Sequence, residues 1–338
     1  MIATMKDVAK YTDLSVGTIS KYINGGTVKE KNKIIIEKAI NDLNFNVNEI
    51  ARGLKTRKSK TIGIIIPSLE NLFCTSLISY VEEYLSKNGY STIICNYREN
   101  IDLEKEKLKL ILNKMVDGII IIPSSEIKDA LIDVINKGIP VVSIDRLIED
   151  VNCDTVLVDN FNASYIAVEQ LIIKGHKRAA IICGPETVYT AQERLKGYLA
   201  VYDNYNINVD HDLIKFGDYY TNSAYKLCKE LIEMEESPTA IFVTNYAMTL
   251  GVIMAINEKN IKVPDEISII GFDNLQMYKI IKPSLSIVIQ PMEQLGEAAA
   301  DIMLRRLQGD KGDFPSIIRL KAKLLMRDSV ADINNLNK

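Results

Sequence analysis

Hydrophobic residues follow two different patterns along the chain, and the change falls near residue 60. In the first 45 residues, apolar positions recur three and four residues apart, as on one face of an amphipathic helix. From residue 61 onward, continuous apolar runs such as Ile62–Ile66 alternate with segments of helical period. Continuous apolar strands with helical crossovers predict parallel sheets covered by helices, because such strands are buried on both faces.

The first part, residues 1–46, carries signals for three short helices. Thr4 is a candidate N-cap and Asp7 the acidic member of a capping box, while Asp13 suits a tight turn because aspartate tolerates left-handed backbone. Ser15 opens the second helix, and Asn24-Gly25-Gly26 ends it. The third helix runs over about Glu30–Leu43, and its apolar residues expected to face inward are Ile34, Ile35, Ala39, Ile40 and Leu43.

Two short helices joined by a tight turn and braced by a third predict a helix-turn-helix domain, in which the second helix enters the major groove of DNA. A small generic helical cap is the alternative that helix spacing leaves open. Charge favours the first interpretation, because residues 1–60 hold 12 Lys and Arg against 6 Asp and Glu, whereas the remainder of the 338-residue chain has a net charge of −9. A basic domain on an acidic body indicates that only this domain meets a polyanion, although basic termini are common.

A basic segment, residues 47–60, follows the third predicted helix. Asn48–Lys55 is nearly helical in pattern, but it is shorter than about 12 residues and contains Gly53, so an isolated helix here is unstable. The alternative, a flexible basic linker, describes the free protein.

The rhythm of strand and helix in residues 61–338 occurs twice. One series begins at Ile62 and the other at Thr155, which predicts two α/β lobes of the same build with a cleft between them. We expect a first lobe of about 61–157 and 290–320, and a second of about 158–289 and 321–332. The predicted fold class is an N-terminal all-α helix-turn-helix domain plus an α/β periplasmic-binding-protein-like body of two Rossmann-like lobes with parallel sheets.

Polar and aromatic residues gather where the predicted strands end. Ligands of parallel sheets bind outside the carboxyl ends of the strands, and polyols need paired donors and acceptors with a ring for their apolar face. An alternative for Asp159-Asn160 is a cap on the following helix, and an alternative for Asn71 is a turn residue. A charge at the end of a buried strand, in contrast, is costly unless it is paired or used. The candidate effector-binding residues are Ser68, Asn71, Phe73, Asp145, Arg146, Asp159, Phe161, Arg194, Asn245 and Asp273.

Several function classes lack their sequence signals. The longest apolar runs are too short to span a bilayer and the first residues show no signal peptide, so we expect a cytoplasmic protein without membrane contact. Five scattered cysteines indicate reduced thiols rather than a disulfide framework or a zinc site. Phosphate-binding and nucleophile motifs are missing, which predicts no enzyme activity, no catalytic residue, no cofactor and no metal site.

The succession of motifs resembles the LacI/GalR (lactose-repressor) family over essentially the whole chain. The segments that carry the resemblance are Met5–Lys10, Leu14–Gly25, Ile50–Thr56, Asp145-Arg146, Arg194–Tyr198, Asn245, Gly271–Asn274, Ser284–Pro291 and a closing strand at Met326–Ser329. His176 belongs to a Gly-His turn that looks structural in this family.

The resemblance implies a homodimer that binds pseudo-palindromic operator DNA, most often as a repressor. The second helix would read bases with Val16, Gly17 and Lys21, although lysine lacks the bidentate fork of the arginine common at that place. The hinge would fold over DNA and wedge Leu54 into the minor groove. Val47 stands where proline is usual, which predicts weaker or more ligand-dependent DNA binding. The implied DNA-binding residues are Thr4, Ser15, Val16, Gly17, Thr18, Ser20, Lys21, Asn24, Asn48, Ala51, Arg52, Leu54 and Lys55.

The same resemblance implies a small effector in the cleft, a sugar or sugar derivative. Asn245-Tyr246 replaces the usual Asn-Asp, and Asn71-Leu72-Phe73 the usual Asn-Pro-Phe, so the identity of the effector is left open. A periplasmic sugar-binding protein would share the body but has no use for residues 1–60. Some members answer instead to a phosphorylated carrier protein docked on the first lobe. The Arg305-Arg306 pair on the predicted helix Glu293–Leu307 suits such docking or is a solvated face.

Overall fold

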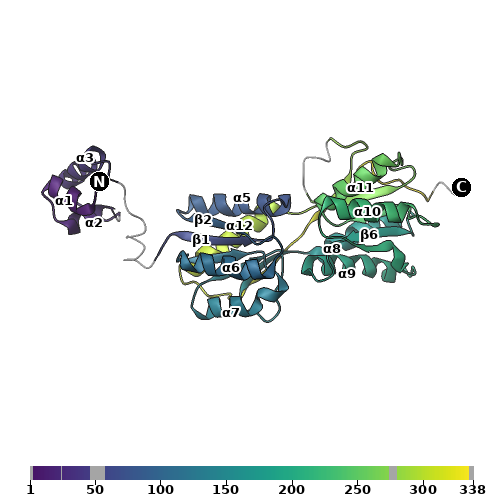
Figure 1. Ribbon diagram of the computed structural model, residues 1–338, viewed down its shortest axis with the longest axis horizontal. Coiled ribbons are helices and arrows are strands. Elements are labelled where there is room, and N and C mark those ends of the chain that lie inside the picture. Colours follow the sequence, from purple (N-terminus) through teal and green to yellow (C-terminus); the bar gives the residue numbers. More distant parts are fainter. Residues whose placement is uncertain (1–2, 24, 46–57, 274–279, 335–338) are drawn as a thin grey trace. The chain divides into compact units, whose positions relative to one another are not determined.

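The computed structural model describes residues 3–23, 25–45, 58–273 and 280–334. The chain divides into two compact units, Met1–Lys60 and Thr61–Lys338, which we call the head and the body (Figure 1).

The head contains three described helices: α1 (Met5–Thr12), α2 (Val16–Ile23) and α3 (Glu30–Asp42). Thr4 caps α1 with both arms of the predicted capping box, since its side chain accepts from the Asp7 amide and its own amide donates to Asp7 Oδ2 at 2.8 Å. Asp13 ends α1 in the left-handed region at φ 53°. The capping box and the turn at Asp13 are confirmed.

The core of the head contains residues of all three helices and Phe45, which follows α3; the helix residues are Val8, Ala9, Ile19, Ile36 and Ala39. The inward face of α3 differs from the prediction, because Ile36 is fully buried and Ile34 is 60% exposed. Residues three or four apart share a helix face, so Ile36 lies with Ala39 and Ile40 while Ile34 falls on the outer side. The prediction that Ile34 faces inward is wrong.

The first lobe of the body is built on a six-stranded parallel sheet in the order β11-β5-β4-β3-β1-β2. Its elements are β1 (Thr61–Ile66), α5 (Leu72–Lys87), β2 (Ser91–Asn96), α6 (Ile101–Asn113), β3 (Gly118–Ile121), η1 (Ser125–Ile127), α7 (Lys128–Asn136), β4 (Val141–Ile144), β5 (Asp154–Val158), α12 (Met292–Leu307) and β11 (Ile317–Leu320). Successive residues of β1 point to opposite faces, so Ile64 packs with α5 and α12 whereas Ile65 packs with α6 and α7.

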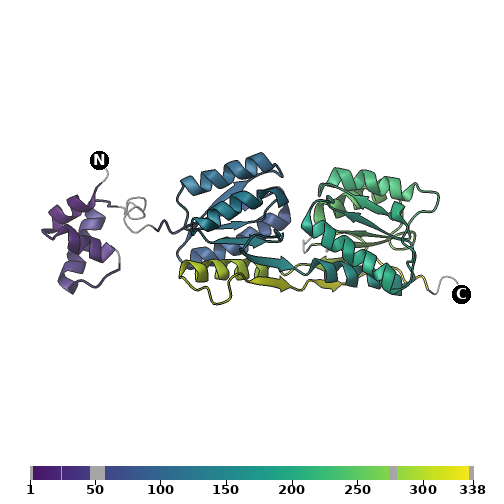
Figure 2. The same ribbon diagram turned by 90° about the horizontal axis from the view of Figure 1, so that it is seen from below.

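The second lobe has a six-stranded sheet in the order β12-β10-β9-β8-β6-β7, parallel except that β12 runs antiparallel to β10. Its elements are α8 (Asn160–Ile173), β6 (Ala179–Cys183), α9 (Tyr189–Asn204), η2 (His211–Leu213), β7 (Ile214–Phe216), α10 (Thr221–Ile232), β8 (Ala240–Val243), α11 (Tyr246–Glu258), β9 (Ser268–Phe272), β10 (Ser286–Ile289) and β12 (Lys323–Leu325). Ile181 packs with α8 and α9, and Ile182 with α10 and α11. Figure 2 shows helices on both faces of each sheet, so the predicted fold class is confirmed.

Within the described residues, the chain passes between the two lobes at Asp159, at Gln290-Pro291 and at Lys321-Ala322. The closing strand differs from its predicted place, because β12 ends at Leu325, before Met326–Ser329. Ser329 instead joins two strands through its side chain, which accepts from the Ser286 amide and donates to the Ile269 carbonyl, both at 2.7 Å.

All five cysteines of the body are buried and unpaired. In the described part of the chain, none of the helices has the length and apolar character that crossing a bilayer requires. The described residues also hold no cluster of three His, Cys, Asp or Glu side chains suited to a metal ion.

Candidate functional sites

The start of α2 forms an exposed polar surface on the head. Ser15 precedes the helix, accepts from the Thr18 amide at 3.2 Å, and lies 2.9 Å from the Thr18 hydroxyl. Val16 is 44% exposed although it is apolar, while Ile19 points into the core. Lys21 is exposed one turn further along. The described start of α2 therefore exposes Ser15, Val16 and Lys21, three of the residues that the sequence predicted to meet DNA.

Two tyrosines brace α1 and α2 against α3. The Tyr11 hydroxyl donates to Asp42 Oδ2 at 2.6 Å, and the Tyr22 hydroxyl donates to Glu37 Oε1 at 2.8 Å. These bonds hold two of the acidic groups of the head on the α3 side. The predicted DNA-binding residues Asn24, Asn48, Ala51, Arg52, Leu54 and Lys55, together with Val47, lie outside the described residues.

A polar cavity in the body lies at the carboxyl ends of strands from both sheets. Its lining includes Asn71 and Phe73 after β1, Asp145 and Arg146 after β4, Asn245 after β8, Asp273 after β9 and Gln290 after β10. Arg194 and Thr190 reach it from α9. The free volume of this inner cavity is about 30 Å³, enough for about two water molecules when one needs about 10–15 Å³. The structure thus brings together seven of the ten predicted effector residues, namely Asn71, Phe73, Asp145, Arg146, Arg194, Asn245 and Asp273.

Asp145 and Arg146 face this cavity from the end of β4. Arg146 donates from Nη2 to Glu99 Oε1 at 3.0 Å and from Nη1 to the Tyr97 hydroxyl and the Pro123 carbonyl, both at 3.3 Å. Asp145 is 8% exposed, has left-handed backbone at φ 68°, and its Oδ1 has no partner among the described residues. Burial raises the pKa of Asp145, and the nearby Arg146 and Arg194 oppose the rise. A buried carboxylate oxygen without a donor is costly, so this atom is suited to a bound molecule that carries a donor.

Arg194 is held from three sides in the second lobe. Its Nε donates to Asn160 Oδ1 at 2.8 Å, its Nη1 donates to the Thr244 carbonyl at 2.6 Å, and its guanidinium carbon lies 3.9 Å from the centre of the Phe272 ring. This arrangement fixes a cation beside the cavity without an ion pair among the described residues.

Asp273 and Gln290 line the cavity from the ends of β9 and β10. Gln290 donates through Nε2 to Asp273 Oδ1, and the Tyr246 amide donates to Asp273 Oδ2 at 3.3 Å. Burial raises the pKa of Asp273, and Arg194 and Gln290 oppose the rise. Because the Gln290 amide nitrogen faces Asp273, its Oε1 is left buried with no partner among the described residues. Gln290 is therefore a second acceptor, which the sequence interpretation missed.

Tyr219 is another cavity residue that the sequence interpretation missed. Its hydroxyl lies 3.1 Å from Thr190 Oγ1, and burial raises its pKa. The ring lies against Gly184, where an added Cβ would be 2.0 Å from Tyr219 Cζ, so any larger residue at this position requires the Tyr219 ring to move. The Cys183-Gly184 step at the end of β6 was the sequence signal for a close approach, but it did not reveal which side chain approaches.

Two of the predicted effector residues, Asp159 and Phe161, line neither this inner cavity nor the outer cavity described below. Asp159 caps α8, accepting from the Asn162 amide at 3.2 Å and from Asn162 Nδ2 at 2.6 Å. Phe161 stacks with Tyr165 at a centroid distance of 6.3 Å. Asn160, between them, instead orients Arg194. The helix cap predicted as the alternative for Asp159 exists. Asn71, for which the alternative was a turn, is instead the N-cap of α5, and its Oδ1 accepts from the Phe73 amide at 2.9 Å.

A second, outer cavity of about 290 Å³ continues from the first and shares Asn71, Tyr219 and Asn245 with it. This volume approaches the range of about 300–1,000 Å³ typical of small-molecule sites. Ser68, the remaining predicted effector residue, lines this outer cavity.

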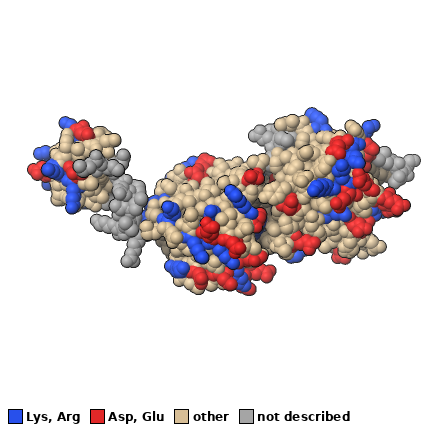
Figure 3. Space-filling model, in the orientation of Figure 1, with Lys and Arg blue, Asp and Glu red and all other residues tan. Residues whose placement is uncertain are grey.

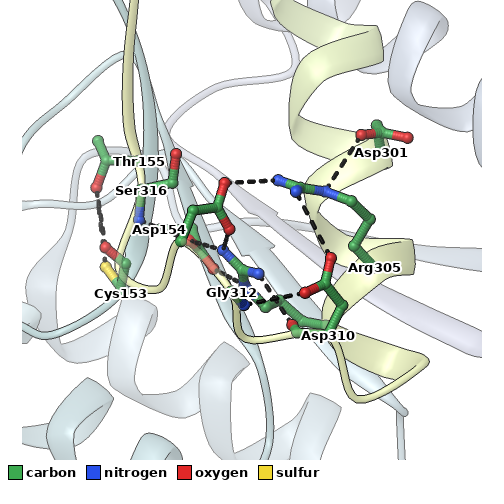
Figure 4. A network of polar contacts seen from close by, with 10 residues as sticks. Cys153, Asp154, Thr155, Asp301, Arg305, Asp310, Gly312 and Ser316 are labelled. Carbon is green, nitrogen blue, oxygen red and sulfur yellow. Dashed lines mark hydrogen bonds and ion pairs between the residues drawn. The ribbon is translucent and has the colours of Figure 1, made fainter.

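The Arg305-Arg306 pair is not the exposed basic surface that the sequence suggested. Arg306 is 9% exposed and donates to both carboxylate oxygens of Asp154 at 2.8 Å, and its Nη2 also reaches Asp313 Oδ1 at 2.8 Å. Arg305 pairs with Asp301, Asp310 and Asp313 (Figure 4). Asp154 Oδ1 also accepts from the Ser316 amide at 2.8 Å, which ties β5 to the segment before β11. Acidic groups surround both arginines, so the pair is a structural clamp in the first lobe.

His176 has a structural role in the second lobe, as its turn suggested. It is 1% exposed, and its Nε2 lies 3.0 Å from the Ala331 carbonyl, to which it donates. Nδ1 lies 3.1 Å from Thr239 Oγ1.

Over the visible face of the body, acidic and basic side chains are interspersed (Figure 3).

A helix-turn-helix head on a two-lobed body of periplasmic-binding-protein type defines a class of DNA-binding regulators. A family model described as "Periplasmic binding proteins and sugar binding domain of LacI family" matches residues 59–326. The HTH-type transcriptional repressor PurR of Pasteurella multocida (strain Pm70) is 32% identical over 332 residues, which are 97% of this chain and 99% of that protein. The repressor of the same name from Proteus mirabilis (strain HI4320) is 34% identical over 336 residues, 98% of each chain.

Solved structures show the same architecture. The lac repressor dimer bound to operator and the anti-inducer ONPF superimposes with a TM-score of 0.89 at 23% identity, over 98% of this chain and 100% of that chain. A LacI family regulator from Enterococcus faecium with bound ribose has a TM-score of 0.72 at 28% identity, over 80% of this chain and 99% of that chain. The chain belongs to the LacI family and is a transcriptional repressor, not an enzyme.

Proposed function

We propose that this repressor binds a pseudo-palindromic operator as a homodimer and that a small ligand between its lobes controls operator affinity. The observation that carries the proposal is a pair of buried acceptors in the lining of the inner cavity, Asp145 Oδ1 and Gln290 Oε1, which have no partner among the described residues. Buried acceptors that no protein group satisfies favour a ligand that supplies donors. Asp145 follows a strand of the first-lobe sheet and Gln290 a strand of the second-lobe sheet, so such a ligand binds one arrangement of the lobes better than another.

The proposed DNA contacts are the exposed residues at the start of α2 and the basic residues that follow the head. Lys21 donates to a base edge or phosphate, and Val16 supplies an apolar contact to a thymine methyl. Leu54 is proposed to enter the minor groove at the operator centre. A ligand that changes the relation of the two lobes then changes the geometry of the paired hinges, by a coupling of about 1–3 kcal/mol if typical of such systems.

A carbohydrate is the proposed ligand class. Carboxylates, amides and tyrosines around a polar cavity suit hydroxyl groups, and the Enterococcus faecium relative is described with bound ribose. The alternative input, a phosphorylated carrier protein docked on the first lobe, loses its main support because Arg306 is buried in an ion pair. Pull-down with the phosphorylated carrier and calorimetry with sugars distinguish these two inputs.

The experiment that tests the proposal is operator footprinting upstream of the adjacent genes with the full chain, with and without each candidate sugar. We expect protection of a two-fold symmetric site, a change in operator affinity with at least one sugar, and loss of affinity in Leu54→Ala. A Leu54→Ala protein that binds the operator as tightly as the wild type removes the hinge from the mechanism. Val47→Pro is expected to strengthen operator binding, because proline presets the backbone at the start of the hinge.

A further inference from the structure

The outer cavity has a composition that the inner cavity does not share. Three carboxylates line it, Glu70 and Glu99 from the first lobe and Asp218 from the second. The described residues that line it include no lysine, arginine or histidine. Its free volume is about ten times that of the inner cavity, so the bulk of any bound molecule has to lie here.

Three tyrosines line the outer cavity together with these carboxylates. Tyr219 is shared with the inner cavity, while Tyr220 and Tyr246 line only the outer one. Tyr220 is 48% exposed, and its pKa is raised by burial and by the carboxylates of Glu99, Glu70 and Asp218. The Asp218 carboxylate accepts from the Tyr220 amide at 2.9 Å, which fixes the backbone on which this ring stands. Exposed tyrosine rings beside carboxylates offer an apolar face together with acceptors.

The two cations in the described lining of the inner cavity are already engaged with the protein. Glu99 holds Arg146 at 3.0 Å, and Arg194 donates to Asn160 and to the Thr244 carbonyl. At the inner end, two acceptors have no partner among the described residues, Asp145 Oδ1 and Gln290 Oε1. One donor, Arg146 Nε, is also without a partner there, but its guanidinium is already paired with Glu99. All three side chains are more than nine-tenths buried. An anionic ligand would therefore meet unpaired acceptors at one end of the connected cavities and carboxylates along the other.

We infer that Glu70, Asp218, Tyr220 and Tyr246 form an outer ligand subsite, which accepts an uncharged or cationic, donor-rich part of the effector and excludes phosphorylated or carboxylated molecules. The inference rests on the proposed function and narrows its ligand class. A hydroxyl or ammonium group reaches Asp145 and Gln290 in the inner cavity, and the remainder of the ligand stacks on Tyr220 and Tyr246. A neutral disaccharide and an amino sugar share this chemistry, because both present donors to carboxylates.

The test is calorimetric titration of the full chain with matched probes: ribose, cellobiose, glucose, glucosamine and glucose 6-phosphate. We expect binding by unphosphorylated members of this panel and at least 10-fold weaker binding by glucose 6-phosphate than by glucose or glucosamine. In the double variant Glu70→Gln/Asp218→Asn, the ratio of the affinities for glucose and glucose 6-phosphate should be at least threefold smaller than in the wild type. Tyr220→Ala and Tyr246→Ala should weaken the best-bound probe about 10-fold.

The matched control is Tyr205→Ala, an exposed tyrosine of the same lobe that lines neither cavity and is expected to bind as the wild type does. Three results overturn the inference: tighter binding of glucose 6-phosphate than of glucose, no binding by any unphosphorylated probe, or unchanged affinity in both tyrosine variants. The proposed function fails separately, if a probe binds in the cleft but leaves operator affinity unchanged in a footprinting assay.

Discussion

Asn160 accepts a hydrogen bond from Arg194 Nε at 2.8 Å and so helps to orient the cation that the described residues of the second lobe contribute to the cavity lining. Asn160 is the first residue of α8 and Arg194 lies on α9, so the contact joins two neighbouring helices at the edge of the cleft. Both side chains are at least 95% buried. The orientation of Arg194 therefore depends on a residue that does not itself line the cavity.

Replacing Asn160 with alanine should weaken ligand binding while leaving operator binding without ligand intact. Loss of a hydrogen bond to a charged group costs about 1.5–3 kcal/mol, which corresponds to roughly 10- to 150-fold in affinity. Titration calorimetry with the best-bound sugar measures the effect. Asn162→Ala is the matched control, since Asn162 lies on the same helix and bonds only Asp159 among the described residues. Equal affinity in the two variants contradicts the role given to Asn160.

Asp145→Asn should stabilise the ligand-free protein at neutral pH and abolish its response to ligand. The pKa of Asp145 is raised by burial, so the folded state binds the proton more tightly than the unfolded state and stability is lost as pH rises through the folded pKa. Above that pH the buried, ionised carboxylate lowers the free energy of unfolding by about 1 kcal/mol relative to the uncharged amide of asparagine. Asparagine tolerates the φ of 68° at this position, whereas alanine does not.

Urea unfolding of the wild type and Asp145→Asn between pH 4 and pH 8 checks this prediction. The difference in the free energy of unfolding should be near zero at pH 4 and should grow toward neutral pH. If the variant is less stable than the wild type at pH 7, the carboxylate of Asp145 stabilises the folded protein, and the prediction is wrong.

Acidification should weaken the second lobe through His176. Burial lowers the pKa of His176 below its usual 6.5, so the unfolded state takes up a proton first. The contribution of the neutral ring is present above about pH 6.5 and is lost as pH falls toward the folded pKa. His176→Gln should be less stable than the wild type at pH 7 and should lose less stability on going to pH 5. His211→Gln, which alters the other histidine of the chain in an exposed turn, should behave as the wild type does in the same urea titrations.

Arg306→Ala should be among the most destabilising single changes in the first lobe. It leaves Asp154 buried without its cation, which costs about 3–5 kcal/mol in the free energy of unfolding. The double variant Asp154→Asn/Arg306→Met removes both charges and should recover much of that loss. Arg305→Ala, whose pairs are partly exposed, should change stability by about 0–1 kcal/mol. Equal effects of Arg305→Ala and Arg306→Ala in urea unfolding are incompatible with the burial described here.

Lys21→Ala should reduce operator affinity more than the same substitution at a lysine elsewhere in the head. A specific base contact contributes about 1–3 kcal/mol, whereas a phosphate contact mainly alters the salt dependence of binding. Lys29→Ala is the control, because Lys29 is an exposed lysine at the start of α3. Fluorescence anisotropy with operator and scrambled DNA at two salt concentrations distinguishes the two contributions. If Lys21→Ala loses affinity equally for both DNAs, Lys21 contacts only the backbone.

Helix caps, turns and buried strands were largely predictable from the sequence, because residues close together in the chain determine them. Thr4 and Asp7 are three residues apart and can bond only within one helix turn, so their capping box was predictable. The continuous apolar runs that form β1 and β3 predicted buried parallel strands. The polar residues after β4, β8 and β9 were expected to line a ligand site at the carboxyl ends of the strands. Ile34 was misjudged because three isoleucines in succession, Ile34 to Ile36, do not define the phase of a helix by themselves.

Only the tertiary structure decided which polar residues meet. Asp159, Asn160 and Phe161 follow the same strand, yet Asn160 alone turns toward Arg194, since the position of α9 selects one residue of the α8 helical turn. Gln290 and Tyr219 were not expected at the cleft from their neighbours in the sequence, and they reach it because two sheets bring their carboxyl ends together. Arg306 is hidden for the same reason, because its partner Asp154 lies 152 residues away in the sequence. Contacts between distant segments depend on how layers pack, and that packing is a property of the whole fold rather than of any one stretch of residues.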